Sequence, residues 1–167
     1  MTIRLLQMFL PLRSRKAAAS FVHPLDPAPR TAILVPGFQA TRNIRIFPQG
    51  WDDAARKFAP ASVAGTFDQL IALTGEDVQL THALICLSWY REDFLSASQR
   101  SFFWNAFGVP VFEQYLGPGN VLWAFECDAH AALHATSAYA GPTFDQFPCP
   151  CGTGRLTGFA ARSASMG

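Results

Sequence analysis

A run of five apolar residues, Ala-Leu-Ile-Cys-Leu, inside the stretch 82–89 constrains the fold of this chain most. Such a run is typical of a strand that is covered on both faces, so we predict a central strand there. A helix is predicted next, because Ser96 and Gln99 form a capping box and Gly108 stands in the C-terminal capping position. A second strand over 109–115 then completes a β-α-β unit, whose two strands are parallel and joined by a right-handed crossover.

Weaker patterns extend this prediction along the chain. The apolar stretch 31–35 predicts a buried strand that ends at a Pro-Gly turn. Helical spacing is present over 51–58 and over 62–73, where Ser62 is the predicted N-cap. The stretch 121–127 predicts a third strand. We therefore expect a small α/β domain with a mainly parallel sheet and flanking helices.

Composition agrees with a globular domain. The chain has 167 residues, of which 50% are hydrophobic and 15% are charged, so it carries enough apolar material for a core. No uncharged apolar run reaches the length of about 18 residues that a membrane-spanning helix needs, so we expect no transmembrane segment. The 13 Lys and Arg residues nearly balance the 12 Asp and Glu residues, and this balance predicts no nucleic-acid partner.

The N-terminal segment differs from the rest of the chain. Residues 1–30 hold five basic residues against one acidic residue, and three prolines near their end are typical of an extended linker. We therefore divide the chain into a basic segment with a linker, 1–30, and an α/β domain, 31–167. Pro11 and Arg13 interrupt the first apolar stretch, which disfavours a secretory signal and makes a cytoplasmic location the expectation.

Four residues of the C-terminal half form a pattern that indicates a metal site. They are Cys127, His134, Cys149 and Cys151, spaced as Cys-x6-His-x14-Cys-x-Cys. Three thiolates and one imidazole suit tetrahedral zinc, and a full ligand set without an open position is typical of a structural site. His130 competes with His134 as the nitrogen ligand. Cys86 lies inside the predicted central strand, where we expect a small core residue.

Several of these segments together resemble a known family. The stretch 107–115, with the sequence FGVPVFEQY, is followed by Gly117-Pro118-Gly119, Glu126-Cys127 and Leu133-His134. This series resembles the phenylacetate-CoA ligase family of adenylate-forming enzymes, and Cys149-Pro150-Cys151-Gly152 is similar to the CPCG turn of its metal-containing members. The resemblance covers roughly residues 80–155. It implies part of a ligase N-terminal domain with a zinc knuckle over 127–152, and it favours His134 over His130 as a ligand.

The chain also departs from that family at the nucleotide site. The family's Tyr-Gly-x-Ser/Thr-Glu motif, whose Glu holds magnesium, is replaced by Tyr115-Leu116-Gly117-Pro118-Gly119. The Ser/Thr/Gly-rich phosphate loop and the C-terminal domain with its catalytic Lys have no counterpart either. Since phosphoryl chemistry depends on positioning and charge stabilisation, we expect adenylation and CoA-ligase activity to be lost.

Two functions are compatible with these observations. The first is a non-catalytic, zinc-stabilised module that acts through a protein partner or as a homo-oligomer, for example as the accessory subunit of a biosynthetic enzyme. The second is an enzyme that reuses the ancestral acyl or aryl pocket beside Tyr115 and Trp123 for an ATP-independent reaction. A hydrolase with Ser88 as nucleophile is less well supported, because Cys86 and Tyr90 occupy the positions where such a turn needs glycine.

Overall fold

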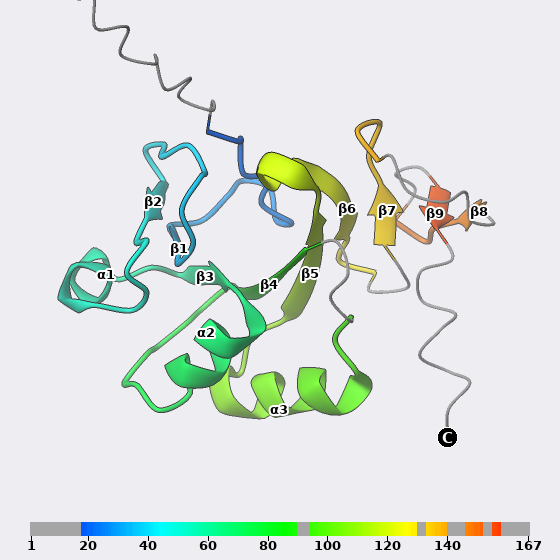
Figure 1. Cartoon of the computed structure of the whole chain (residues 1–167). Helices are drawn as coiled ribbons and strands as arrows, with labels where there is room; N and C mark the ends of the chain where they lie inside the picture. Colours follow the sequence, from blue (N-terminus) through cyan, green and yellow to red (C-terminus); the bar gives the residue numbers. More distant parts are fainter. Residues whose placement is uncertain (1–17, 90–93, 130–132, 140–145, 152–154, 158–167) are drawn as a thin grey trace, which may run out of the picture.

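A computed structural model provides the architecture of the chain, and the structure describes residues 18–89, 94–129, 133–139, 146–151 and 155–157. Within these residues the strands form one nine-stranded sheet in the order β2-β1-β3-β4-β5-β6-β7-β9-β8 (Figure 1). The strands are β1 (Thr31–Ile33), β2 (Ile44–Ile46), β3 (Ser62–Gly65), β4 (Ala83–Trp89), β5 (Val111–Leu116), β6 (Leu122–Glu126), β7 (Leu133–Ala135), β8 (Gln146–Pro148) and β9 (Arg155–Thr157). The helices are α1 (Asp53–Phe58), α2 (Phe67–Leu73), α3 (Ala97–Phe107) and the short 3-10 helix η1 (Pro118–Asn120).

The predicted β-α-β unit is confirmed. Strands β4 and β5 pair in parallel, and α3 forms the connection between them. The helix begins at the capping box of Ser96 and Gln99, and it ends at Gly108, whose positive φ of 65° suits glycine. Strand β4 is buried along nearly its whole length, as its apolar run predicts.

Two layers cover the parallel half of the sheet. On one face, Phe58 of α1, Leu70 of α2 and Phe103 of α3 share a core with Leu84 of β4. On the other face, aromatic and aliphatic side chains from the segment before β1 and the loop after it pack against the sheet. They include Phe21, Leu25 and Phe38. Strands β1, β3, β4 and β5 therefore contribute residues to both cores, whereas β2 contributes Ile44 and Ile46 to the second core only.

The expectation of a mainly parallel sheet is wrong. The four pairings from β2 to β5 are parallel, and the four from β5 to β8 are antiparallel. The direction changes after β5, because only Gly117–Val121 separates β5 from β6 and so short a connection cannot carry a crossover helix. The protein is thus a mixed α/β structure with one parallel and one antiparallel half.

The helix predicted over 62–73 is also corrected. Residues 62–65 form β3, which pairs with β1 and β4 and is buried throughout. The N-cap of α2 is Thr66, whose side chain accepts a hydrogen bond from Gln69 N, and not Ser62. The pair Thr66 and Gln69 is a second capping box, and it marks the true start of the helix.

Candidate metal centre

All four predicted metal ligands come together in the antiparallel half of the sheet. Cys127 directly follows β6, and His134 lies in the middle of β7, the strand that pairs with β6. Cys149 and Cys151 follow β8, before the chain returns as β9. The antiparallel pairs β6–β7 and β8–β9 therefore place three thiols and one imidazole close together.

The four ligand atoms are close enough to share an ion. One ligand atom from each residue lies within 4.8 Å of the other three. The sulfurs of Cys127 and Cys149 are 3.6 Å apart, and the sulfur of Cys151 is 3.4 Å from Nε2 of His134. All four cysteines of the chain are free thiols, since a disulfide needs a sulfur–sulfur distance of about 2.0 Å.

Burial disfavours the thiolate form of these cysteines unless a cation lies beside them. Cys127, Cys149 and His134 are buried, and Cys151 is half-buried. Burial, together with the neighbouring Cys149 and Cys151, raises the pKa of Cys127 to about 12, although a backbone hydrogen bond from Ala129 acts in the opposite direction. A divalent ion supplies the positive charge that stabilises neighbouring thiolates, so the site can bind a metal ion.

The surroundings fix the orientation of these ligands. The ring of His134 stacks on Phe125 at a centroid distance of 5.3 Å, and the two residues face each other across the β6–β7 pairing. Glu126, the residue before Cys127, is held by Arg100 of α3, whose Nη1 donates to the Glu126 carboxylate at 2.8 Å. Helix α3 is thereby linked to the strand that carries the first cysteine.

Arg100 also serves a second buried carboxylate. Its Nη2 donates to Glu113 of β5 at 2.9 Å, while the hydroxyl of Ser88 and the backbone N–H of Leu95 donate to the same carboxylate. Glu113 is only 1% exposed. Burial raises its pKa from 4.5 to about 7; Arg100 counteracts this rise and Glu126 adds to it. This network was not predicted from the sequence, although a glutamate inside the apolar stretch 109–115 was a signal of it.

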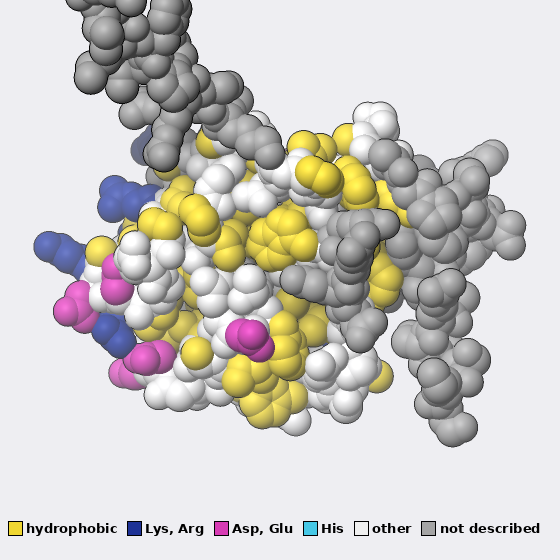
Figure 2. All heavy atoms as spheres, viewed as in Figure 1, with side chains coloured by type: hydrophobic (Ala, Val, Ile, Leu, Met, Phe, Trp, Pro, Cys, Tyr) yellow, Lys and Arg dark blue, Asp and Glu magenta, His cyan; other side chains and the backbone are white. Residues whose placement is uncertain are grey.

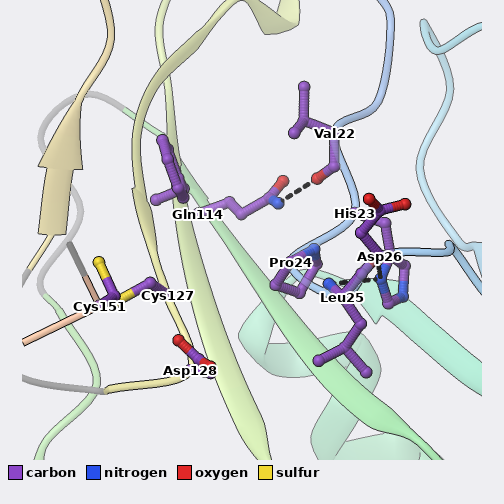
Figure 3. Close-up of a pocket in the computed structure, with 10 residues that line it drawn as sticks. Val22, His23, Pro24, Leu25, Asp26, Gln114, Cys127, Asp128 and Cys151 are labelled. Atoms are coloured by element: carbon purple, nitrogen blue, oxygen red, sulfur yellow. Dashed lines mark hydrogen bonds between the residues drawn. The ribbon is translucent and has the colours of Figure 1, made fainter. Parts of the chain in front are cut away.

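A cavity of about 450 Å³ lies beside the metal centre. Figure 3 shows it between the segment 22–26 and the strands that lead to Cys127. Its lining residues are Val22, His23, Pro24, Leu25, Asp26, Gln114, Phe125, Cys127, Asp128 and Cys151. The sequence analysis did not single out this cavity, because its walls are far apart in the chain.

The other residues considered from the sequence are placed as follows. Cys86 is a core residue, as predicted, and is 1% exposed. Ser88 donates its hydroxyl to Glu113. Tyr115 and Trp123 pack together, with Phe94 against the first ring and Tyr139 against the second. His130 and Gly152, like residues 1–17, lie outside the described residues.

Comparisons of the chain with protein-family models, with curated proteins and with solved structures find no match. What the site does is therefore argued from its own geometry. None of the helices in the described part of the chain is both long enough and apolar enough to span a membrane.

Proposed function

We propose that this protein is a non-catalytic module whose three cysteines and one histidine hold a structural zinc ion, and that it acts by binding a protein. The spacing of the ligand atoms carries the proposal. Tetrahedral bonds of about 2.3 Å to sulfur and about 2.0 Å to nitrogen place two sulfurs about 3.8 Å apart, and a sulfur and a nitrogen about 3.5 Å apart. Two of the six distances between ligand atoms, 3.6 Å and 3.4 Å, agree with this geometry, and all six lie within 4.8 Å.

The ligand set favours a structural role over a catalytic one. A catalytic zinc keeps one position for water or substrate, whereas Cys127, His134, Cys149 and Cys151 fill all four. Three thiolates also donate much charge to the ion and weaken it as a Lewis acid. Free thiols in such a set need a reducing compartment, which supports a cytoplasmic location.

The proposed partner surface is formed by apolar side chains on the helical face. Phe102 and Trp104 of α3 are 46% and 54% exposed, and Ile71 of α2 is 38% exposed. Figure 2 shows hydrophobic side chains gathered over α3 in the lower part of the view. Two exposed aromatic side chains and an exposed isoleucine on these helices favour a protein interface, with another protein or with a second copy of the chain.

Descent from a phenylacetate-CoA ligase stays an inference from the sequence motifs. It would account for a metal site that persists beside a lost nucleotide site. The alternative function, an ATP-independent enzyme built around Tyr115 and Trp123, has less support, because these rings pack on Phe94 and Tyr139.

Metal analysis of the purified chain tests the zinc centre. We expect about one zinc per chain, and we expect Cys149→Ser to lower the zinc content and to reduce the melting temperature by about 10 °C or more. Cys86→Ala is the matched control, because it removes a buried thiol from the core and should leave the zinc content unchanged. Wild-type protein that is stable and holds no zinc would refute the proposal.

The partner surface needs a separate test. The tagged full chain, isolated from its native host, should carry a stoichiometric partner, and the complex should re-form from purified components; if the partner is a second copy, light scattering should give a dimer. Trp104→Ala should weaken either complex at least tenfold, as is typical of an aromatic hot spot. Asn105→Ala, on the same exposed helix, is the control. A monomer without a partner, or equal effects of both variants, would count against this surface.

A further inference from the structure

The cavity beside the metal centre has a strongly one-sided charge. Among its ten lining residues, Asp26 and Asp128 are exposed acids, and there is no Lys or Arg. Neither aspartate forms an ion pair with a described residue. The thiols of Cys127 and Cys151 add further negative charge when they bind a divalent ion, since three thiolates exceed its charge by one. The cavity therefore attracts cations.

Two polar side chains at the cavity each have one atom without a described partner. Gln114 is 2% exposed, and its amide reaches from β5 to the segment 22–26, where Nε2 donates to the carbonyl of Val22 at 2.6 Å (Figure 3). No described donor reaches its Oε1. Nε2 of His23 is also buried and unpartnered within the described residues. The backbone N–H of Leu25 donates to Nδ1 of His23 at 3.0 Å, so Nε2 carries the proton in that tautomer and is a donor; it is not one of the acceptors of the cavity.

The remaining walls are apolar. Val22, Pro24, Leu25 and Phe125 contribute hydrocarbon surface, so a simple metal cation is a poor match for the space. A ligand with a charged hydrogen-bond donor at one end and an aliphatic chain at the other matches both the acidic and the apolar side chains that line the cavity. The volume of about 450 Å³ suits a group of this size.

We propose that this cavity binds an organic cation, an ammonium or guanidinium group on an aliphatic chain, which the charges of Asp26 and Asp128 attract and which can donate to Gln114 Oε1. Two sources carry this chemistry: a free amine, and a lysine or arginine side chain of the protein partner. The second source rests on the proposed function, whereas the first does not. Binding a cation here would place the ligand beside two of the metal-binding cysteines.

Amide chemical shifts of the holoprotein test the proposal. Titration with n-butylammonium chloride should shift the amide signals of residues 22–26, 114 and 125–128, and sodium butyrate at the same ionic strength should not. The Asp26→Asn/Asp128→Asn double variant should bind n-butylammonium about tenfold more weakly, since each exposed charge contributes modestly. Asp68→Asn, an exposed acid on α2, is the matched control and should bind like the wild type.

A second probe distinguishes the sources. If n-butylammonium and Nα-acetyl-lysine methylamide bind equally, the natural ligand is a side chain of the protein partner. If n-butylammonium alone binds, the natural ligand is a free amine. The proposal is overturned if neither probe binds, if butyrate binds equally, or if the double variant and the control bind alike. Zinc content, measured on the same samples, reports on the metal centre independently, because the two aspartates keep their charge whether or not zinc is bound.

Discussion

Glu113 makes the stability of this protein sensitive to pH. Its carboxylate is buried beneath Ser88, Leu95 and Arg100, and its pKa rises from 4.5 to about 7. Between these values the folded state keeps the proton that the unfolded state has released. The free energy of unfolding should therefore fall from pH 4.5 to pH 7 by about 3 kcal/mol and stay level above pH 7 as far as this group is concerned.

Urea unfolding at pH 5, 6, 7 and 8 checks this, with Glu113→Gln as the variant. The difference in the free energy of unfolding between wild type and Glu113→Gln separates the effect of Glu113 from the acid sensitivity of the metal centre. The stability of the wild type relative to the variant should fall as the pH rises to 7. Glu76→Gln, a change at an exposed glutamate, should leave the pH profile nearly unaltered. A difference between wild type and Glu113→Gln that stays constant over this range would contradict the assignment.

Arg100, the only charged residue of α3, should be sensitive to substitution. It is the cation between two buried carboxylates, Glu113 at 2.9 Å and Glu126 at 2.8 Å. Removing one partner from a buried ionic network leaves uncompensated charge, so Arg100→Leu should lower the free energy of unfolding by about 3 kcal/mol. Equilibrium unfolding measures the loss, and Arg56→Leu, at an exposed ion pair, should cost less than about 1 kcal/mol. Equal costs would show that burial does not matter here.

At the scale of single elements, α3 depends on its N-cap. The Ser96 hydroxyl accepts from Gln99 N, and the Gln99 side chain accepts from Ser96 N. Ser96→Ala should cost about 1 kcal/mol of stability, measured by thermal or urea unfolding. Ser101→Ala, on the exposed part of the same helix, should be neutral or slightly stabilising. If both substitutions behave alike, the capping box contributes nothing.

The accuracy of the sequence predictions also differed by element. Helix α3 and strand β4 were predictable, because a capping box and a fully apolar run are local signals. Strand β3 was not, because Ser62, Ala64 and Gly65 have low strand propensity and only pairing with β1 and β4 makes them a strand. The box at Thr66 and Gln69 was visible in the sequence and would have corrected the helix boundary.

At the scale of the whole molecule, local signals could not give the direction of the later strands. The four candidate ligands were predictable from residue type and spacing, and the structure brings them together. The cavity and the Arg100 network were not predictable, because the tertiary fold alone creates them. It brings Gln114 to Val22 at the cavity, and Arg100 to Glu126 in the network. Long-range contacts of this kind leave no periodic pattern in the sequence.

The two halves of the sheet should differ in their dependence on the metal. Both large apolar cores belong to the parallel half, whereas the antiparallel half has only a small apolar cluster of Tyr115, Ala124 and Leu133 and the group of Cys127, Cys149 and Cys151 among the described residues. Strands β7, β8 and β9 each span three residues. Chelation with EDTA should therefore speed hydrogen exchange in peptides carrying β7, β8 and β9, while β4 stays protected. Exchange that rises equally in both halves, followed by mass spectrometry, would contradict this division.

The order of the strands along the chain bears on biosynthesis. Every residue of the five parallel strands precedes Gly117, and every candidate metal ligand follows it. A growing polypeptide can complete the parallel half while Cys127, Cys149 and Cys151 are still inside the ribosome. With the proposed zinc ion, metal capture would follow the folding of the parallel half, and a cell short of zinc would accumulate chains in which that half is folded and the antiparallel half is not.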